Sequence, residues 1–230
     1  MSRDREPRVG VSIAYQSRLL TSKGDMQLSD SRRQKSLPWF WIAGAVWLIG
    51  AVAGLSVLWR FDNEPGVPAN APVRWPAAPG VLALASGGPT LVLLAHPQCS
   101  CTRATLNELA EALARARTRP RTYVVFLKPE GFSNGWEQTD LWRMAAALPD
   151  VTVVRDDDGR EARRFGTATS GQTLLYESSG ALLFSGGITG ARAHAGDNAG
   201  RRSLIALLDG ERSDRAGTNV FGCPLFAAGI

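Results

Sequence analysis

The feature that most restricts this chain is a run of 23 uncharged residues from Leu37 to Trp59. A helix rises about 1.5 Å per residue, so this run is long enough to cross a bilayer core about 30 Å thick. Trp39, Trp41 and Trp59 stand near its ends, where membrane proteins place aromatic rings. We expect a transmembrane helix over 37–59, since a buried helix of a soluble protein seldom runs this long without a charge.

The charges that flank this run predict its orientation. Three basic residues precede it, at Arg32, Arg33 and Lys35. One basic and two acidic residues follow it, at Arg60, Asp62 and Glu64. By the positive-inside rule, the N-terminus is cytoplasmic and the chain after residue 59 is periplasmic. We therefore expect a single-pass protein of the cell inner membrane.

A cleaved signal peptide is the alternative, because Ala69-Asn70-Ala71 has the small-x-small form of a cleavage site. The apolar run exceeds the usual 7–15 residues of a signal peptide. Pro72 would also be the first residue after the cut. Both facts favour an anchor that stays attached.

Composition divides the chain further. Residues 1–60 hold nine basic and four acidic side chains, which leaves 17 of each for the remainder. The net charge of +5 therefore lies in the N-terminal part, and a nucleic-acid-binding domain, which needs a basic face, is excluded. Residues 1–36 lack periodicity and are expected to be a disordered cytoplasmic arm, within which Met26 is an alternative start.

Proline marks the next boundary. Residues 60–80 contain five prolines and are expected to form a semi-rigid linker between the membrane and the domain. We expect the folded domain over 81–212 and a C-terminal tail with Cys223 over 213–230. No nucleotide-binding glycine motif occurs, so no organic cofactor is expected.

A strand, a tight turn and a helix surround two cysteines near the start of the domain. Residues 91–95 are apolar and read as a buried strand. Cys99 and Cys101 follow the turn at 96–98, and apolar residues then recur at helical spacing. Sulfur at a helix N-terminus is favoured as the thiolate by the unpaired N–H groups and the helix dipole.

The rest of the domain alternates between strands and helices. Strands are expected at 90–95, 122–128 and 151–154, helices at about 101–117, 138–147, 160–165 and 198–209, and a hairpin over 173–185. This order predicts an α/β fold with a mixed sheet flanked by helices.

With these features the chain resembles the thioredoxin-like superfamily and, more narrowly, the RedB-type membrane-anchored proteins of bacteria. The stretches that carry the narrower resemblance are His96-Pro-Gln-Cys-Ser-Cys-Thr-Arg-Ala-Thr-Leu106, Arg164-Phe-Gly-Thr-Ala-Thr-Ser-Gly171, Ser185-Gly-Gly-Ile-Thr-Gly190, His194-Ala-Gly-Asp-Asn198 and Phe221-Gly-Cys-Pro-Leu225. The resemblance implies a thioredoxin-like sheet and thiol chemistry.

Two departures from thioredoxins accompany the resemblance. Thioredoxins use Cys-x-x-Cys, whereas this chain has Cys-x-Cys. Thioredoxins also place a cis-proline beside the thiols, and Ser170-Gly-Gln-Thr173 has none. Gly171 or Gln172 is then expected to supply the backbone contact for a substrate.

The favoured function is thiol–disulfide exchange by Cys99 and Cys101 with a periplasmic or membrane thiol/disulfide protein. Residues i and i+2 in a turn can be bridged, but the small ring is strained, which makes such a disulfide oxidising. We expect Cys99 to attack and Cys101 to resolve. The reverse assignment, an inert pair, and peroxide reduction at Cys99 stay open.

Three further residues are candidates for supporting roles. His96 either stabilises the thiolate and moves a proton or is structural. Cys223 is an odd cysteine, which either exchanges with Cys99 or anchors an apolar tail. Copper-binding thioredoxin-like proteins combine two such cysteines with a late histidine, so Cys99, Cys101 and His194 form an alternative copper ligand set of a metallochaperone.

Overall fold

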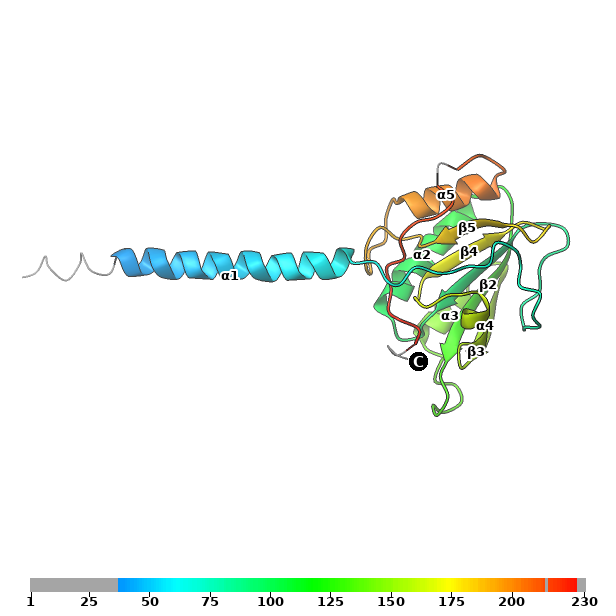
Figure 1. Ribbon diagram of the computed structural model, residues 1–230, viewed down its shortest axis with the longest axis horizontal. Helices are drawn as coiled ribbons and strands as arrows, with labels where there is room; N and C mark the ends of the chain where they lie inside the picture. Colours follow the sequence, from blue (N-terminus) through cyan, green and yellow to red (C-terminus); the bar gives the residue numbers. More distant parts are fainter. Residues whose placement is uncertain (1–36, 214, 227–230) are drawn as a thin grey trace, which may run out of the picture. The chain divides into compact units, whose positions relative to one another are not determined.

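A computed structural model describes residues 37–213 and 215–226, so the expected arm at 1–36, including Met26, lies outside the described residues. Helix α1 spans Leu37–Asn63 (Figure 1). It continues past Trp59 because the Asn63 side-chain amide donates to the Trp59 carbonyl at 2.8 Å and caps the last turn. Pro65 then excludes further helix.

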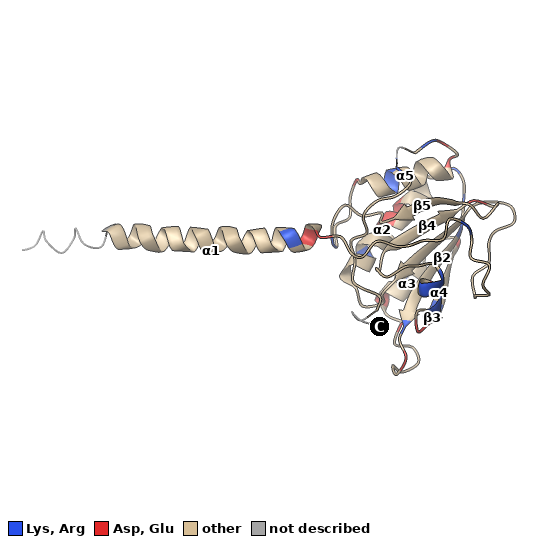
Figure 2. Cartoon of the chain, viewed as in Figure 1, with Lys and Arg blue, Asp and Glu red and all other residues tan. Residues whose placement is uncertain are grey.

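The composition of α1 suits a membrane span. In the part of the chain that the structure describes, the stretch Pro38–Asn63 is the one helix long and apolar enough to cross a bilayer, and its most apolar stretch is not buried by other residues. Its charges are confined to the C-terminal end (Figure 2). Exposed apolar side chains over a whole helix are what lipid contact requires, which supports a single-pass anchor.

The domain is built on a five-stranded mixed sheet with the order β3-β2-β1-β4-β5. Strand β1 (Thr90–Ala95) is central, and β2 (Arg121–Lys128) and β3 (Val151–Asp157) run parallel to it on one side. On the other side β4 (Gln172–Tyr176) and β5 (Leu182–Gly186) form an antiparallel hairpin. This arrangement confirms the predicted mixed α/β sheet.

Helices cover both faces of the sheet. Helices α2 (Ser100–Arg115), α3 (Asp140–Ala146) and α5 (Ala199–Leu208) share one apolar core with the sheet. The short helix α4 (Arg160–Arg164) contributes to a second core on the opposite face. All six residues of β1 are buried, which explains why its sequence is a continuous apolar run instead of an alternating one.

The proline-rich segment after α1, expected as a semi-rigid linker over 60–80, lies instead along the domain. From Gly66 onward it is hydrogen-bonded along the domain, for example from the Trp75 N–H to the Gly180 carbonyl at 2.7 Å. The Trp75 ring packs edge-on against Phe165 and Tyr176, at 5.1 and 5.3 Å between ring centroids. The domain therefore begins near residue 66, because this extended segment covers the second core.

The expected tail is also part of the domain. The Leu225 N–H donates to the Ala168 carbonyl at 2.8 Å, and an isolated antiparallel bridge joins Thr169 to Pro224. Leu225 is buried in the second core. Extended segments of this kind have no periodicity, so their packing depends on distant partners that the local sequence does not reveal.

Candidate active site

The turn between β1 and α2 places Cys99 at the N-cap of the helix. Cys99 has extended backbone angles, φ −97° and ψ 122°, and its carbonyl accepts from the Thr102 N–H at 3.0 Å. No side chain caps this helix end. The first N–H groups of α2 and its dipole therefore act on the Cys99 sulfur, as the sequence predicts.

Two side-chain hydroxyls hold this turn in place. The Thr102 hydroxyl lies 3.0 Å from both the His96 carbonyl and the Ser170 hydroxyl oxygen. The Ser170 hydroxyl also accepts from the His96 N–H at 2.8 Å. Thr102 and Ser170 are both buried, so these bonds fix the distance between the thiol turn and the loop before β4.

Three cysteines meet at the start of α2. Cys101 lies in the first helical turn, and its thiol donates to the Cys99 sulfur. Cys223, from the C-terminal segment, lies with its sulfur 2.8 Å from that of Cys99. Cys99 and Cys101 are 2% and 5% exposed, whereas Cys223 is only half-buried. All three are free thiols.

The three thiols differ sharply in acidity. The pKa of Cys99 is lowered to about 4, chiefly by the hydrogen bond from the Cys101 thiol. The Cys223 thiol and the N–H groups of Cys223 and Thr102 lower this pKa further, whereas burial opposes the shift. Donation to Cys99, followed by burial, raises the pKa of Cys101. Burial, followed by donation to Cys99, raises the pKa of Cys223 to about 11. Cys99 is thus the thiolate of the group.

His96 is beside the thiols but engaged in the turn. Burial lowers the pKa of His96, and the charge of Cys99 partly opposes this shift. The His96 Nδ1 accepts from the Gln98 N–H at 3.2 Å, and the ring meets the edge of Trp136 at 5.7 Å. His96 therefore helps to shape the turn, and its role in moving a proton stays a prediction.

Gly171 and Gln172 lie next to the site and are both hydrogen-bonded within the domain. The Gly171 N–H donates to the Leu94 carbonyl at 2.8 Å, and the Gln172 side chain donates to the Ser185 hydroxyl at 3.0 Å. The backbone groups that pair with the C-terminal segment belong instead to Ala168 and Ser170. A substrate contact by Gly171 or Gln172 stays a prediction.

The structure brings Cys99 and Cys101 together but leaves His194 exposed in the loop before α5. Within the described residues, no group of three or more histidine, cysteine or acidic side chains is placed to hold a metal ion. The copper ligand set is therefore not assembled in this arrangement.

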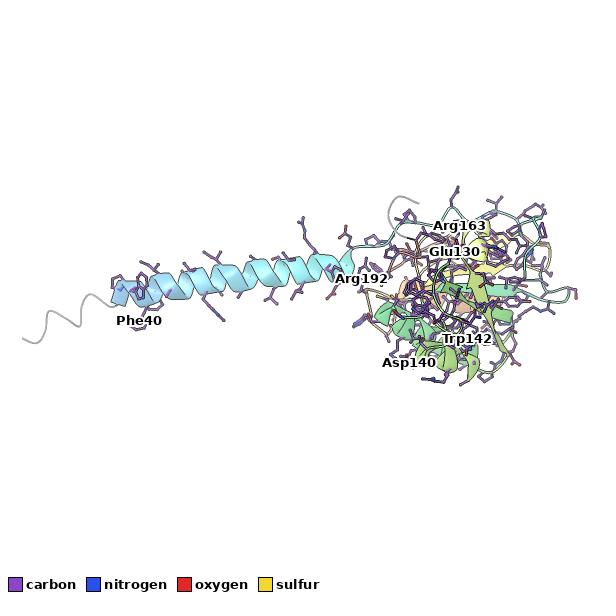
Figure 3. The ribbon with its side chains drawn as sticks, turned by 90° about the horizontal axis from the view of Figure 1, so that it is seen from below. Phe40, Glu130, Asp140, Trp142, Arg163 and Arg192 are labelled. Carbon is purple, nitrogen blue, oxygen red and sulfur yellow. The ribbon has the colours of Figure 1, made fainter. Side chains whose placement is uncertain are left out.

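Sequence reasoning missed two residues that support the site. The Arg192 guanidinium (Figure 3) donates to the Gly222 carbonyl at 2.8 Å, and its charge counteracts the raised pKa of Cys223. Glu108, buried in α2, pairs with Arg201 of α5 at 2.7 Å. Glu108 also accepts a hydrogen bond from the Gly196 N–H and so fixes the 190–198 loop. In this loop, the Ala193 N–H counteracts the raised pKa of Cys101. No local pattern marks either residue.

A mixed sheet with helices on both faces and thiols between β1 and α2 defines a thioredoxin-like α/β domain. The chain is similar to the crystal structure of an uncharacterized conserved protein from Geobacillus kaustophilus, with a TM-score of 0.52 and 14% identity over 73% of this chain and 94% of that chain. This likeness supports the fold.

Weaker similarities involve two named proteins. A secreted Mycobacterium tuberculosis disulfide oxidoreductase homologous to E. coli DsbE matches with a TM-score of 0.33 and 16% identity over 42% of this chain and 67% of that chain. An exposed lipoprotein thioredoxin from Streptococcus pneumoniae matches with a TM-score of 0.37 and 15% identity over 54% and 86%. No family model and no curated protein matches the sequence.

Proposed function

We propose that this chain is a membrane-anchored thiol–disulfide oxidoreductase in which Cys99 is the attacking thiolate. The observation that carries the proposal is the placement of Cys99 at the N-cap of α2, with its sulfur 2.8 Å from that of Cys223. The Cys101 thiol beside it lowers the pKa of Cys99 to about 4. A thiolate at neutral pH is the reactive form in disulfide exchange.

The exchange uses Cys99 and Cys101 in turn. The Cys99 thiolate attacks a disulfide of the partner protein, forms a mixed disulfide and releases one partner sulfur as a thiolate. Cys101 then loses its proton to solvent and attacks the Cys99 sulfur, which releases the second partner sulfur. The partner disulfide is reduced, Cys99 and Cys101 are oxidised to a disulfide, and the reverse sequence oxidises a partner dithiol.

The proposal places this chemistry outside the cytoplasm. The basic residues before α1 favour a cytoplasmic N-terminus, and an oxidising compartment allows a disulfide to persist. The partner is then a periplasmic or membrane protein with a thiol pair of its own. The stretches that resemble RedB-type proteins support membership of that group.

Trapping the mixed disulfide tests the proposal. In the full chain with Cys101→Ser and Cys223→Ser, Cys99 attacks a partner but no second cysteine is left to resolve the mixed disulfide, so covalent complexes should accumulate in membranes and disappear on reduction. The Cys99→Ser variant of the same chain is the matched control and should give none. Complexes that form equally in both variants, or in neither, would contradict the assignment of Cys99.

A further inference from the structure

Solvent has little access to the reactive sulfur of Cys99. Cys99 and Cys101 are 2% and 5% exposed, so neither sulfur meets solvent to a useful extent in this state. The thiol with the greatest exposure is Cys223, which lies directly on Cys99 with 2.8 Å between the sulfurs. A reagent that approaches the site from solvent therefore meets Cys223 first.

The backbone around Cys223 is held firmly in this position. The Ser170 N–H donates to the Cys223 carbonyl at 2.9 Å, and the flanking Leu225 N–H donates to Ala168 at 2.8 Å. These bonds are those of an added antiparallel strand. The segment is thus docked as an extended peptide would be, with its cysteine aimed at Cys99.

Gly222 makes this close approach possible. A Cβ atom at residue 222 would lie 1.8 Å from the Ser170 carbonyl oxygen, which no real structure tolerates. Arg192 also donates to the Gly222 carbonyl at 2.8 Å. The contact at Gly222 leaves no room for a side chain, and the Arg192 cation holds the Gly222 carbonyl. Cys223 is therefore positioned more closely than the anchoring of an apolar tail requires.

We propose that Cys223 is a third redox thiol, which forms a disulfide with Cys99 and relays exchange between the buried pair and thiols outside. This inference rests on the proposed function, because it needs a reactive Cys99. A disulfide requires about 2.05 Å between sulfurs, so the two atoms need to approach by less than about one ångström.

The relay carries oxidation from the Cys99–Cys101 disulfide to external thiols. Starting from the Cys99–Cys101 disulfide, which a disulfide of the partner protein regenerates, Cys223 loses its proton to solvent and attacks the Cys99 sulfur. The Cys99–Cys223 disulfide forms, and Cys101 leaves as a thiolate and takes up a proton. An external thiolate then attacks Cys223 and releases the Cys99 thiolate. A second external thiol completes an external disulfide and frees Cys223.

The acidity of the thiols favours attack of the external thiolate at the Cys223 sulfur. In disulfide exchange the sulfur with the lower pKa leaves faster. The pKa of Cys99 is lowered to about 4 and that of Cys223 is raised to about 11. Attack on Cys223, which is also the exposed sulfur, therefore expels the better leaving group.

Mapping disulfides in the full chain tests the relay. The Cys101→Ser variant, reduced and then exposed to oxidised glutathione in lipid nanodiscs, should give the Cys99–Cys223 disulfide by peptide mass spectrometry. Cys99 found joined to glutathione, with Cys223 free, would overturn the relay while leaving Cys99 reactive as proposed. Cys99 found unmodified would overturn the relay and the proposed function together.

Two further variants separate the relay from a structural role of the segment. Gly222→Ala should displace the segment and cause loss of the Cys99–Cys223 disulfide in the Cys101→Ser background. Gly87→Ala, where a Cβ meets no atom within 4 Å, is the matched control and should keep it.

Cys223→Ser in the otherwise unchanged chain should still form the Cys99–Cys101 disulfide but lose oxidation of a reduced peptide with two cysteines. Unchanged peptide oxidation would overturn the relay.

Discussion

At Cys99 several donors converge on one sulfur. The Cys101 and Cys223 thiols and the N–H groups of Thr102 and Cys223 all act to lower its pKa, and burial only partly opposes them. Hydrogen bonds to the charged form and a helix N-terminus are the known causes of acidic cysteines. The acidity of Cys99 therefore depends on residues distant in sequence as well as on its own turn.

Removal of the Cys101 donor should make Cys99 less acidic. Cys101→Ala deletes the largest of the lowering effects, so the pH midpoint for alkylation of Cys99 should rise from the value near 4 toward that of a free thiol. Cys101→Ser keeps a donating hydroxyl and should shift the midpoint less. Rates of iodoacetamide alkylation across pH, followed by mass spectrometry of the Cys99 peptide, measure both. Equal midpoints for the two variants would contradict this account.

The charge of Arg192 should affect Cys223 specifically. Its guanidinium counteracts the raised pKa of Cys223, so Arg192→Met should slow alkylation of Cys223 at mildly alkaline pH. Arg192→Lys keeps the charge and should restore part of the rate. Methionine also removes the bond to Gly222. Identical rates in the methionine and lysine variants would rule out the charge effect.

Sequence alone reveals part of this site. Cys99 and Cys101 stand next to a recognisable strand and helix, so their placement at a helix start is predictable from periodicity. Cys223 is separated from Cys99 by 124 positions, and its segment has no periodic pattern. Only the folded sheet, through Ala168 and Ser170, brings that segment to the thiols.

At the level of elements, a buried ion pair connects α2 to α5. Glu108 and Arg201 are both largely buried, with 2.7 Å between them, and Asn198 also donates to Glu108 at 3.1 Å. The loop between β5 and α5 depends on this pair, since the Gly196 N–H donates to the same carboxylate. The thiol helix and the loop over Cys101 are thereby fixed together.

Breaking this pair should destabilise the domain. Glu108→Ala leaves the buried Arg201 with only its longer pair to the exposed Asp197, at 3.6 Å. Removal of one partner from a buried pair costs about 3–5 kcal/mol in comparable cases. The matched control is Glu111→Ala on the same helix, whose pair with Arg115 is exposed and should change stability by no more than about 1 kcal/mol. Urea unfolding of both variants measures the difference, and similar midpoints would show that the pair carries no stability.

Most elements follow closely from the sequence, although β3 continues to Asp157, three residues past its predicted end at 154. The strands at 90–95 and 122–128 and the hairpin after residue 172 match the structure within about a residue because burial gives them continuous apolar runs. The extended segment after Gly66 was not predictable in the same way. Prolines there suggest a linker, yet Trp75 packs into the second core, and such packing depends on partners far along the chain.

As a whole molecule, the chain consists of a helix whose apolar surface suits contact with lipid and a thioredoxin-like domain. The exposed side chains of α1 include Leu48, at 58% exposure, near the middle of the helix. A charge at the centre of a membrane span costs about 2.5–3.5 kcal/mol for insertion. We therefore expect a charge at the centre of α1 to weaken membrane attachment and to leave the thiol site unchanged.

Leu48→Arg should shift part of the protein out of the membrane fraction of a bacterial host. Val73→Arg is the matched control, because Val73 is even more exposed, at 80%, but lies after α1. It should leave the protein in the membrane. Fractionation and alkaline extraction of both variants measure this difference, and equal distribution would contradict the assignment of α1 as the anchor.

Reversible disulfide exchange at the Cys99 thiolate is the core of the proposed function. The most direct measurement is a redox titration of the full chain in lipid nanodiscs, with the fraction of Cys99 in a disulfide quantified by mass spectrometry at each glutathione ratio. We expect a two-electron transition in which Cys99 is bonded to Cys101 or Cys223. A Cys99 that forms no disulfide at any glutathione ratio would contradict it.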